Sequence, residues 1–300
     1  MIEFKPVTLS SKGWVDDIVR AENSESADFN FGNIYIWDKH YRQLIAKRDG
    51  RMLTKLRYNG KPAFVFPIGS GPLSPAVDAL KEFADFRGYP FILRGITEKN
   101  LALLESVYPG RFEYSEDTDN FDYVYDINSL ASYSGKMMHG KKNHCNRFER
   151  ENDWHFEKMT REHIPGCMDM LSVWQEDNAG RLEESIGYEH DAIVRAFAAF
   201  DKLELEGGVL FIKDSIAGFT VGERCSEGCF DVHFEKAVIS INGAYPMVCR
   251  EFSKMLREEH PELKHINRED DMGIEALRTS KLSYKPEFLL KKYTARWIYD

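Results

Sequence analysis

The chain has 300 residues, of which 43% are hydrophobic and 30% are charged. These fractions are typical of a soluble globular protein and exclude a disordered chain, a collagen-like repeat and a disulfide-dense mini-protein. Acidic residues outnumber basic ones by 49 to 40, and the net charge is −9. A chain this acidic has no global reason to bind nucleic acid or an anionic membrane.

The apolar runs are too short to cross a bilayer, and the N-terminal residues lack the apolar segment of a signal peptide. The five cysteines are odd in number and form no C-x-x-C pair. We therefore expect a reduced, cytoplasmic protein without an integral membrane segment. Peripheral contact with a membrane stays open.

The first 127 residues predict one α+β domain. In chain order, the pattern predicts a helix over 10–22, strands over 41–47, 52–58 and 63–68, a helix over 74–87, a strand over 90–95, a helix over 98–107 and a strand over 123–126. The pairs Asp49-Gly50 and Asn59-Gly60 between the first strands are strong hairpin signals, so these strands should form an antiparallel meander. The acidic stretch 115–120 reads as a loop.

Residues 128–300 repeat the same order of elements. The pattern predicts helices over 136–152, 163–177 and 189–201, strands over 208–213, 215–224 and 229–235, a helix over 243–259, a strand over 263–267, a helix over 273–281 and a strand over 286–297. A meander followed by alternating helices and strands indicates mixed, mainly antiparallel sheets rather than a Rossmann fold. We place the domain boundary near residue 127.

Residues 136–150 form a basic segment in this acidic chain. The segment holds five Lys or Arg against one Glu, a local charge of +4 that leaves −13 for the rest. As a helix, it aligns polar and basic residues in one stripe: Lys136, Asn143, Arg147 and Arg150. Met138, Cys145 and Phe148 form a neighbouring face suited to a core. The stripe is either a solvated helix face or a row of cations that contacts phosphates.

A second cluster lies on the strand that begins at Cys229. Strict alternation places Asp231, His233 and Glu235 on one face, which predicts a surface for proton transfer or amine binding. The alternative is the solvent-facing side of an antiparallel sheet. Cys225, Cys229 and His233 do not match the spacing of structural zinc sites, so we expect two cysteines flanking a turn and no metal.

A third cluster follows the strand predicted over 263–267. Asp270 and Asp271 precede the helix predicted from Gly273, where they can cap the helix or line a site at the end of the strand. Arg278 and Lys281 share one face of that helix. They could bind an anionic ligand or form ion pairs with a carboxylate of the protein such as Glu275.

The sequence holds no P-loop, H-E-x-x-H or G-x-S-x-G motif, and Pro72 follows Gly69-Ser-Gly71 where a dinucleotide loop would continue. The stretch 238–244 contains one Gly and no Arg or Gln, unlike the pyrophosphate loop of acetyl-CoA enzymes. This argues against acetyl-CoA without excluding it.

Taken in order, several motifs resemble the C-terminal catalytic domain of phosphatidylglycerol lysyltransferases, also called aminoacyl-phosphatidylglycerol synthases, and its soluble relatives. The motifs are Gly135-Lys136 with Lys141-Lys142-Asn143, Asn146 and Phe148; Gly218-Phe219 with Gly222-Glu223; Phe234–Ala237 with Gly243–Tyr245; and Asp271–Gly273 with Leu277-Arg278, Lys281 and Pro286. Family members are similar to the FemABX aminoacyltransferases. The resemblance therefore implies two tandem GNAT-like (acyl-CoA N-acyltransferase) domains, 1–127 and 128–300, with the active site in the second.

The resemblance also implies an enzyme that transfers an aminoacyl group from charged tRNA to an acceptor, which is a lipid, a peptide or a small molecule. On that basis the catalytic candidates are Glu235, Asp271, His233 and Arg278. The substrate-binding candidates are Glu223, Lys281 and Tyr245. The candidates for contact with tRNA phosphates are Lys136, Lys141, Lys142 and Arg147.

Two other functions stay open. One is an acyl-CoA-dependent N-acyltransferase, with acetyl-CoA or another acyl-CoA as donor. The other is a binding module that keeps this fold without catalysis. For an aminoacyltransferase we expect no cofactor, with aminoacyl-tRNA as co-substrate. The acceptor is not identified.

Overall fold

The computed structural model describes residues 2–178 and 183–299, with side chains for 2–176 and 187–299. The chain forms two compact units. The first contains Met1–Asp122, Asp270–Gly273 and Leu290–Asp300, and the second contains Tyr123–Glu269 and Ile274–Leu289. The sequence pattern predicts two consecutive domains that meet near residue 127. In the structure, the first continuous segment of the first unit ends at Asp122, and two later segments of the chain return to that unit.

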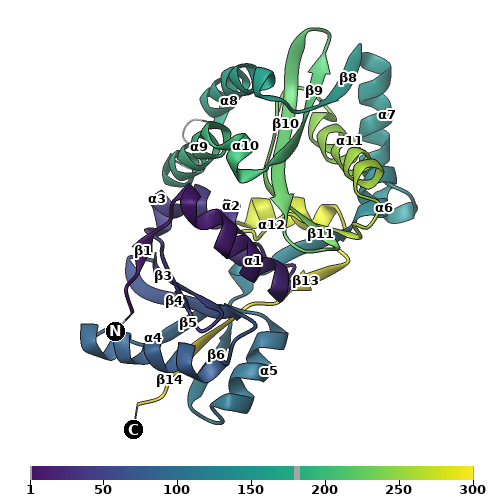
Figure 1. Cartoon of the computed structure of the whole chain (residues 1–300). Coiled ribbons are helices and arrows are strands. Elements are labelled where there is room, and N and C mark those ends of the chain that lie inside the picture. The colour runs from purple at the N-terminus through teal and green to yellow at the C-terminus, as the bar shows by residue number, and fades with distance from the viewer. Residues whose placement is uncertain (1, 179–182, 300) are drawn as a thin grey trace. The chain divides into compact units, whose positions relative to one another are not determined.

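The first unit is built on a seven-stranded sheet in the order β1-β2-β3-β4-β5-β14-β6 (Figure 1). Its strands are β1 (Lys5–Pro6), β2 (Leu44–Arg48), β3 (Arg51–Tyr58), β4 (Lys61–Gly69), β5 (Ile92–Ile96), β6 (Phe112–Glu116) and β14 (Tyr293–Trp297). The predicted meander is confirmed by antiparallel β2–β3 and β3–β4 pairs. Asp49-Gly50 and Asn59-Gly60 turn these hairpins with positive φ at all four residues, which is the backbone that such tight turns require.

The helices of the first unit are α1 (Lys12–Glu22), α2 (Phe31–Ile36), α3 (Asp38–Tyr41), α4 (Leu73–Arg87) and α5 (Glu98–Val107). The short helices α2 and α3 and strand β6 were not predicted. One ion cluster around the buried Lys292 joins separate parts of this unit. Lys292, which is 2% exposed, contacts Asp122 at 2.7 Å and Asp28 at 3.1 Å.

The second unit is built on a sheet in the order β13-β7-β12-β11-β10-β9-β8. Its strands are β7 (Asp122–Asp126), β8 (Trp154–Lys158), β9 (Glu206–Ile212), β10 (Ser215–Arg224), β11 (Cys229–Ala237), β12 (His265–Asn267) and β13 (Phe288–Leu290). Most of the pairs are antiparallel, whereas β11 and β12 run parallel. Both sheets are mixed and mainly antiparallel, which confirms the predicted α+β fold class.

Helices cover both faces of the second sheet. They are α6 (Ile127–Ser132), α7 (His139–Glu151), α8 (Ile164–Asn178), α9 (Glu183–Ala198), α10 (Phe200–Leu203), α11 (Ala244–Glu259) and α12 (Glu275–Ser283). Figure 1 shows α7 and α11 on one side of β10 and α8, α9 and α10 on the other. Cys145 and Phe148 of α7 are fully buried in the core that α11 shares with the sheet, which confirms the predicted apolar face of the basic segment.

A β-bulge at His233 corrects the predicted alternation of β11. Val221 pairs with Phe234 and Gly222 pairs with Val232, so His233 is an extra residue in the ladder. A Cβ on Gly222 would lie 1.9 Å from the carbonyl oxygen of Asp231, so only glycine permits this approach of the strands. The bulge separates Glu235 from the Asp231 and His233 face.

Other differences from the predicted elements have tertiary causes. Strand β8 and helix α6 were not predicted, and the single strand predicted over 286–297 is two strands in different sheets, β13 and β14. β14 pairs with β5 and β6 of the first unit, so its partners come from more than 170 residues earlier in the chain. Among the described residues, no helix has both the length and the apolar composition needed to cross a bilayer.

Candidate active site

The bulged strand β11 and its parallel neighbour β12 bring together a carboxylate and a guanidinium. Arg268 follows the last residue of β12, and its Nη2 donates to Oε1 of Glu235 at 2.8 Å. The side chains are 13% and 9% exposed. The buried Nη1 of Arg268 has no hydrogen-bond partner within the described part of the chain. A group with acceptor oxygens would satisfy this nitrogen, because buried donors are nearly always paired.

Glu235 lies among several cations. Burial raises the pKa of Glu235 above its ordinary value, and the charges of Arg268, Lys141 and Lys281 oppose that rise. The Lys141 ammonium lies 3.6 Å from the centre of the Tyr284 ring, and the Arg268 guanidinium lies 4.5 Å from the same centre. Burial, with a contribution from Arg268, lowers the pKa of Lys141. Titratable groups whose pKa values are shifted in opposite directions are a frequent mark of an acid–base site.

Lys281 fastens helix α12 to the loop that carries Arg268. Its Nζ donates to the backbone carbonyl of Arg268 and, at 3.1 Å, to that of Glu269. The Tyr125 hydroxyl in turn donates to the backbone carbonyl of Lys281 at 2.9 Å. These bonds hold the loop after β12, so Lys281 both positions Arg268 and adds positive charge near Glu235.

Tyr245, in the first turn of α11, belongs to a second group of contacts. Its hydroxyl oxygen accepts a hydrogen bond from Nε1 of Trp174 at 2.9 Å. The ring of Trp174 lies 3.9 Å below the Lys236 ammonium, which pairs with Glu189 at 2.8 Å. Burial raises the pKa of Tyr245 to about 12, so the hydroxyl keeps its proton and can donate it.

On the other face of β11, three carboxylates surround His233. Its Nε2 lies 3.1 Å from Glu223, and its Nδ1 lies 2.9 Å from Glu269 and 3.6 Å from Asp231. Burial alone would lower the pKa of His233, but Glu223 and Glu269 hold it well above its ordinary value. An imidazole with both nitrogens directed at carboxylates is a poor proton acceptor, so the geometry favours Glu235 over His233 as a base.

Two further candidates from the sequence lie just before and within helix α12. Asp271 belongs to the first unit, where it is 1% exposed and its Oδ1 accepts from the backbone N–H of Gly273 at 2.9 Å. Helix α12 begins at Glu275 with Ile274 as its N-cap, so Asp271 does not cap that helix. Arg278 lies on α12, half-buried, one turn before Lys281.

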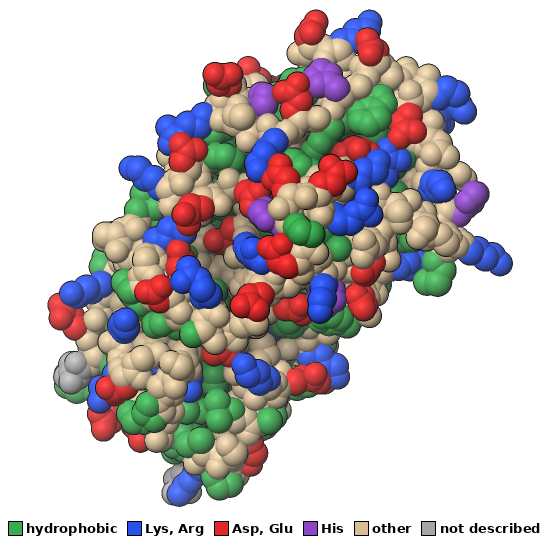
Figure 2. All heavy atoms as spheres, turned by 45° about the vertical axis from the view of Figure 1, so that its right-hand side comes forward, with side chains coloured by type: hydrophobic (Ala, Val, Ile, Leu, Met, Phe, Trp, Pro, Cys, Tyr) green, Lys and Arg blue, Asp and Glu red, His purple; other side chains and the backbone are tan. Residues whose placement is uncertain are grey.

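The basic segment divides into two parts. Lys136, Lys142 and Arg147 are exposed, and Arg147 forms two hydrogen bonds with Glu151, at 2.9 and 3.0 Å. Lys141 is half-buried against Tyr284 and belongs to the Glu235 cluster instead. Figure 2 shows Lys and Arg side chains interspersed with Asp and Glu over the visible face.

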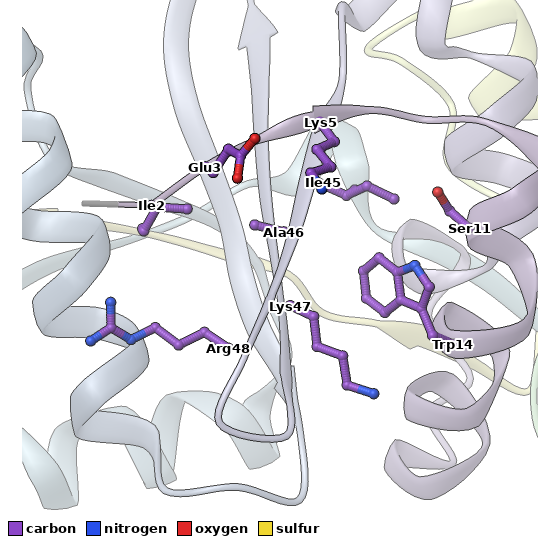
Figure 3. Close-up of a pocket in the computed structure, with 9 residues that line it drawn as sticks. All are labelled: Ile2, Glu3, Lys5, Ser11, Trp14, Ile45, Ala46, Lys47 and Arg48. Carbon is purple, nitrogen blue, oxygen red and sulfur yellow. The ribbon is translucent and has the colours of Figure 1, made fainter.

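A hollow of about 460 Å³ lies in the first unit (Figure 3). Lys5, Lys47 and Arg48 contribute cations to its wall, and Trp14 contributes an indole ring. It contains none of the candidate residues identified from the sequence. Its cations are on long side chains at the sheet edge formed by β1 and β2, and we assign it no role.

The sequence did not single out Arg268, Tyr284, Trp174 or Glu189 as site residues. Arg268 lies in the polar cluster after the strand predicted over 263–267. Its position at the end of a strand was the feature of the sequence that could have identified it as a site residue. Trp174 and Tyr284 had no signal, because their roles depend on the neighbours that the fold gives them.

Comparison with solved structures defines the class of fold. A conserved protein of unknown function from Bacteroides thetaiotaomicron is 34% identical, with a TM-score of 0.94 over 99% of this chain and 100% of that one. L-PGS from Bacillus licheniformis is 17% identical, with a TM-score of 0.69 over 99% and 94%. FemX is 10% identical, with a TM-score of 0.64 over 98% and 97%. The chain therefore has the tandem GNAT-like fold of acyl- and aminoacyltransferases.

The family model for the C-terminal part of phosphatidylglycerol lysyltransferase matches residues 20–296, and the chain belongs to that family. It is accordingly an enzyme of the acyl- or aminoacyltransferase class. An uncharacterised protein of Mycoplasmoides gallisepticum is 28% identical over 193 residues, which span 61% of this chain and 58% of that protein. The chain thus matches little more than half the length of this curated relative.

Proposed function

We propose that this protein transfers an aminoacyl group from charged tRNA to an acceptor and that the Glu235 cluster is the reaction centre. The observation that carries the proposal is the buried Glu235–Arg268 pair with Lys141 and Lys281 nearby. In this mostly buried cluster, a carboxylate whose pKa is raised lies beside several cations. The unit that contains the cluster has a transferase fold.

The chemistry of aminoacyl transfer matches these groups. An acceptor hydroxyl or amine attacks the ester carbonyl, loses a proton, and forms a tetrahedral intermediate with a negative oxygen. Glu235 is the group placed to accept the proton, because burial raises its pKa toward the working range of a base. Arg268 and Lys141 supply positive charge for the oxyanion, and the unpaired Nη1 of Arg268 offers a donor. The proton then passes to the leaving tRNA hydroxyl.

The loop before α11 supports an aminoacyl ester over an acyl-CoA as donor. In this loop, Oδ1 of Asn242 lies 2.8 Å from Nδ1 of His144 on α7. A Cβ on Gly243 would lie 2.5 Å from the carbonyl oxygen of His144, so helix α7 packs directly against the loop. A pyrophosphate needs free backbone N–H groups and space at such a loop. The contact with α7 leaves few free N–H groups and little space for a pyrophosphate at this loop.

The exposed part of the basic segment is our proposed contact for tRNA phosphates. Lys136, Lys142 and Arg147 project to solvent from α7 and the turn before it. We assign Lys141 to the Glu235 cluster instead, because its ammonium lies against the Tyr284 ring. The family model is named for phosphatidylglycerol lysyltransferase, which suggests a lipid as acceptor. A peptide or a soluble small molecule with an amine or hydroxyl is equally compatible with the chemistry.

The test is a donor assay with the purified full-length chain. A mixture of radiolabelled charged tRNAs is incubated with phosphatidylglycerol vesicles, a peptide amine or a small-molecule pool, and acetyl-CoA is tested in parallel. We expect acceptor-dependent loss of label from tRNA, with the label recovered on the acceptor and lost activity in Glu235→Gln. Consumption of acetyl-CoA with no loss of label from tRNA would overturn the proposal.

A further inference from the structure

The carboxylate and histidine cluster on the other face of β11 is separate from the Glu235 site. Three side chains there offer one ligand atom each, and these atoms all lie within 4.8 Å of one another: Asp231, His233 and Glu269. Asp231 and His233 have fully buried side chains, whereas Glu269 is 19% exposed. A small ion could therefore reach the cluster from the side of Glu269.

We propose that Asp231, His233 and Glu269 form a binding site for a divalent transition-metal ion, with Zn²⁺ as the best match to the donor set. One imidazole nitrogen and two carboxylate oxygens are ligands that zinc accepts in sites with an open fourth position. A tetrahedral zinc site with bonds of about 2.0–2.1 Å separates its ligand atoms by roughly 3.3 Å. Nδ1 of His233 lies 2.9 Å from Glu269 and 3.6 Å from Asp231, on either side of that value.

Glu223 supplies the outer partner that a metal-binding histidine usually has. Its carboxylate lies 3.1 Å from Nε2 of His233, so it accepts the Nε2–H hydrogen and directs Nδ1 toward Asp231 and Glu269. Such a carboxylate–histidine–metal arrangement orients the ring and raises the affinity of the ligand nitrogen. The metal replaces the proton on Nδ1, and the Nε2 proton stays in place.

Charge favours the same assignment. Three carboxylates, from Glu223, Asp231 and Glu269, surround one buried imidazole. A proton on Nδ1 supplies one positive charge to this cluster, whereas a divalent ion bound to the neutral ring supplies two.

The scaffold already holds the ligands in place. Asp231 and His233 both lie on β11, and Nδ1 of His233 is 3.6 Å from the Asp231 carboxylate. Glu269 has a φ of 56°, and its backbone N–H donates to Oδ1 of Asn267 at 2.7 Å. The backbone N–H of Tyr123 donates to the backbone carbonyl of Glu269 at 3.1 Å. The ligands therefore come from strand β11 and from the loop directly after β12, two segments that the sheet holds side by side.

A second group of possible ligands provides a contrast. Glu206, Glu259 and His260 also converge, at a more exposed place. Lys158 already occupies that group, since its Nζ lies 3.3 Å from Glu206 and contacts Glu259. An ammonium there takes the place of a metal ion, so this group serves as an internal control.

The test is metal titration of the full-length protein after dialysis against EDTA. Calorimetry with Zn²⁺ and visible absorption with Co²⁺ should show about one ion per chain in a low-symmetry site. Glu269→Gln should weaken binding at least 100-fold, Glu223→Gln should weaken it about 10- to 100-fold, and His260→Gln should bind as the unmodified protein does. Circular dichroism of each variant confirms that it is folded.

Glu269→Gln is the decisive variant because its side chain is partly exposed, whereas Asp231→Asn and His233→Ala alter fully buried groups. Absence of saturable binding, or binding that Glu269→Gln leaves intact, would overturn the proposal. So would loss of binding in His260→Gln alone. Because the readout is binding, failure of the aminoacyltransferase proposal would not affect this result.

Discussion

Arg268 and Glu235 stand 33 residues apart in the chain, yet Nη2 of the first donates to Oε1 of the second at 2.8 Å. The pair exists because Asp231 of β11 lies opposite Asn267 of β12 in a parallel register. β12 ends at Asn267, whereas β11 continues to Ala237, so Arg268 in the loop after β12 lies beside the continuing part of β11. Functional sites commonly lie at such strand ends.

The first prediction concerns Glu235 as the base. Glu235→Gln keeps the shape of the side chain but cannot accept a proton, so kcat/KM for aminoacyl transfer should fall by about 100- to 10,000-fold. The KM for charged tRNA should change little, because the tRNA contacts are elsewhere. Steady-state kinetics with labelled aminoacyl-tRNA measure both. A loss of less than about 5-fold would remove Glu235 from the mechanism.

The second prediction concerns pH. Glu235 must be ionised to act as a base, and burial raises its pKa above the ordinary 4.5, so the acid limb of kcat/KM should lie above that value. Arg268 is the largest influence that opposes this rise. Removing its charge in Arg268→Gln therefore raises the Glu235 pKa further, and the acid limb should move to higher pH.

Arg257→Gln is the matched control, because it removes a guanidinium from an exposed position near the end of α11. The acid limb of this variant should coincide with that of the unmodified protein. Arg268→Lys, which keeps the charge, should shift the limb less than Arg268→Gln. A limb that moves to lower pH in Arg268→Gln would contradict the assignment.

The third prediction concerns the basic segment. The double charge reversal Lys136→Glu with Lys142→Glu should weaken tRNA binding and make it less dependent on salt. Each lost phosphate contact reduces the slope of log K against log salt concentration by about 0.7–0.9. Filter binding between 50 and 200 mM salt measures this, with Lys202→Glu, an exposed cation on α10, as the control. Equal slopes in the double variant and the control would place the tRNA contacts elsewhere.

The fourth prediction concerns stability of the first unit. Lys292→Met removes the buried cation that contacts the buried Asp122 and the partly exposed Asp28. Leaving the buried Asp122 carboxylate without this charge should lower the free energy of unfolding by about 3–5 kcal/mol. Urea denaturation followed by fluorescence measures the change. The adjacent Lys291→Met removes an exposed ammonium 3.5 Å from Glu116 and should cost less than about 1 kcal/mol.

The double variant Lys292→Met with Asp122→Asn separates charge from packing. If the loss arises from uncompensated carboxylates, this variant should be more stable than Lys292→Met alone. A double variant that is no more stable would show that the aliphatic part of Lys292, and not its charge, supports the unit.

Local patterns in the sequence predicted much of the fold. The hairpins at Asp49-Gly50 and Asn59-Gly60 depend on residues that accept positive φ, and the buried face of α7 depends on helical spacing. The family motifs along residues 135–286 also pointed to the transferase class before the fold was known. Each of these signals involves residues close together in the chain or already grouped in motifs.

The tertiary structure decided where the chemistry lies. Alternation along β11 placed Glu235 beside His233, but the bulge opposite Gly222 moved these side chains to different clusters. The basic segment directs Lys141 toward Tyr284 and leaves Lys136 and Lys142 in solvent. The sequence by itself determined the tight hairpins and most of the longer helices, because short-range sterics and burial set them. Register, bulges and strand neighbours follow from long-range pairing, and only that pairing made Arg268 the partner of Glu235.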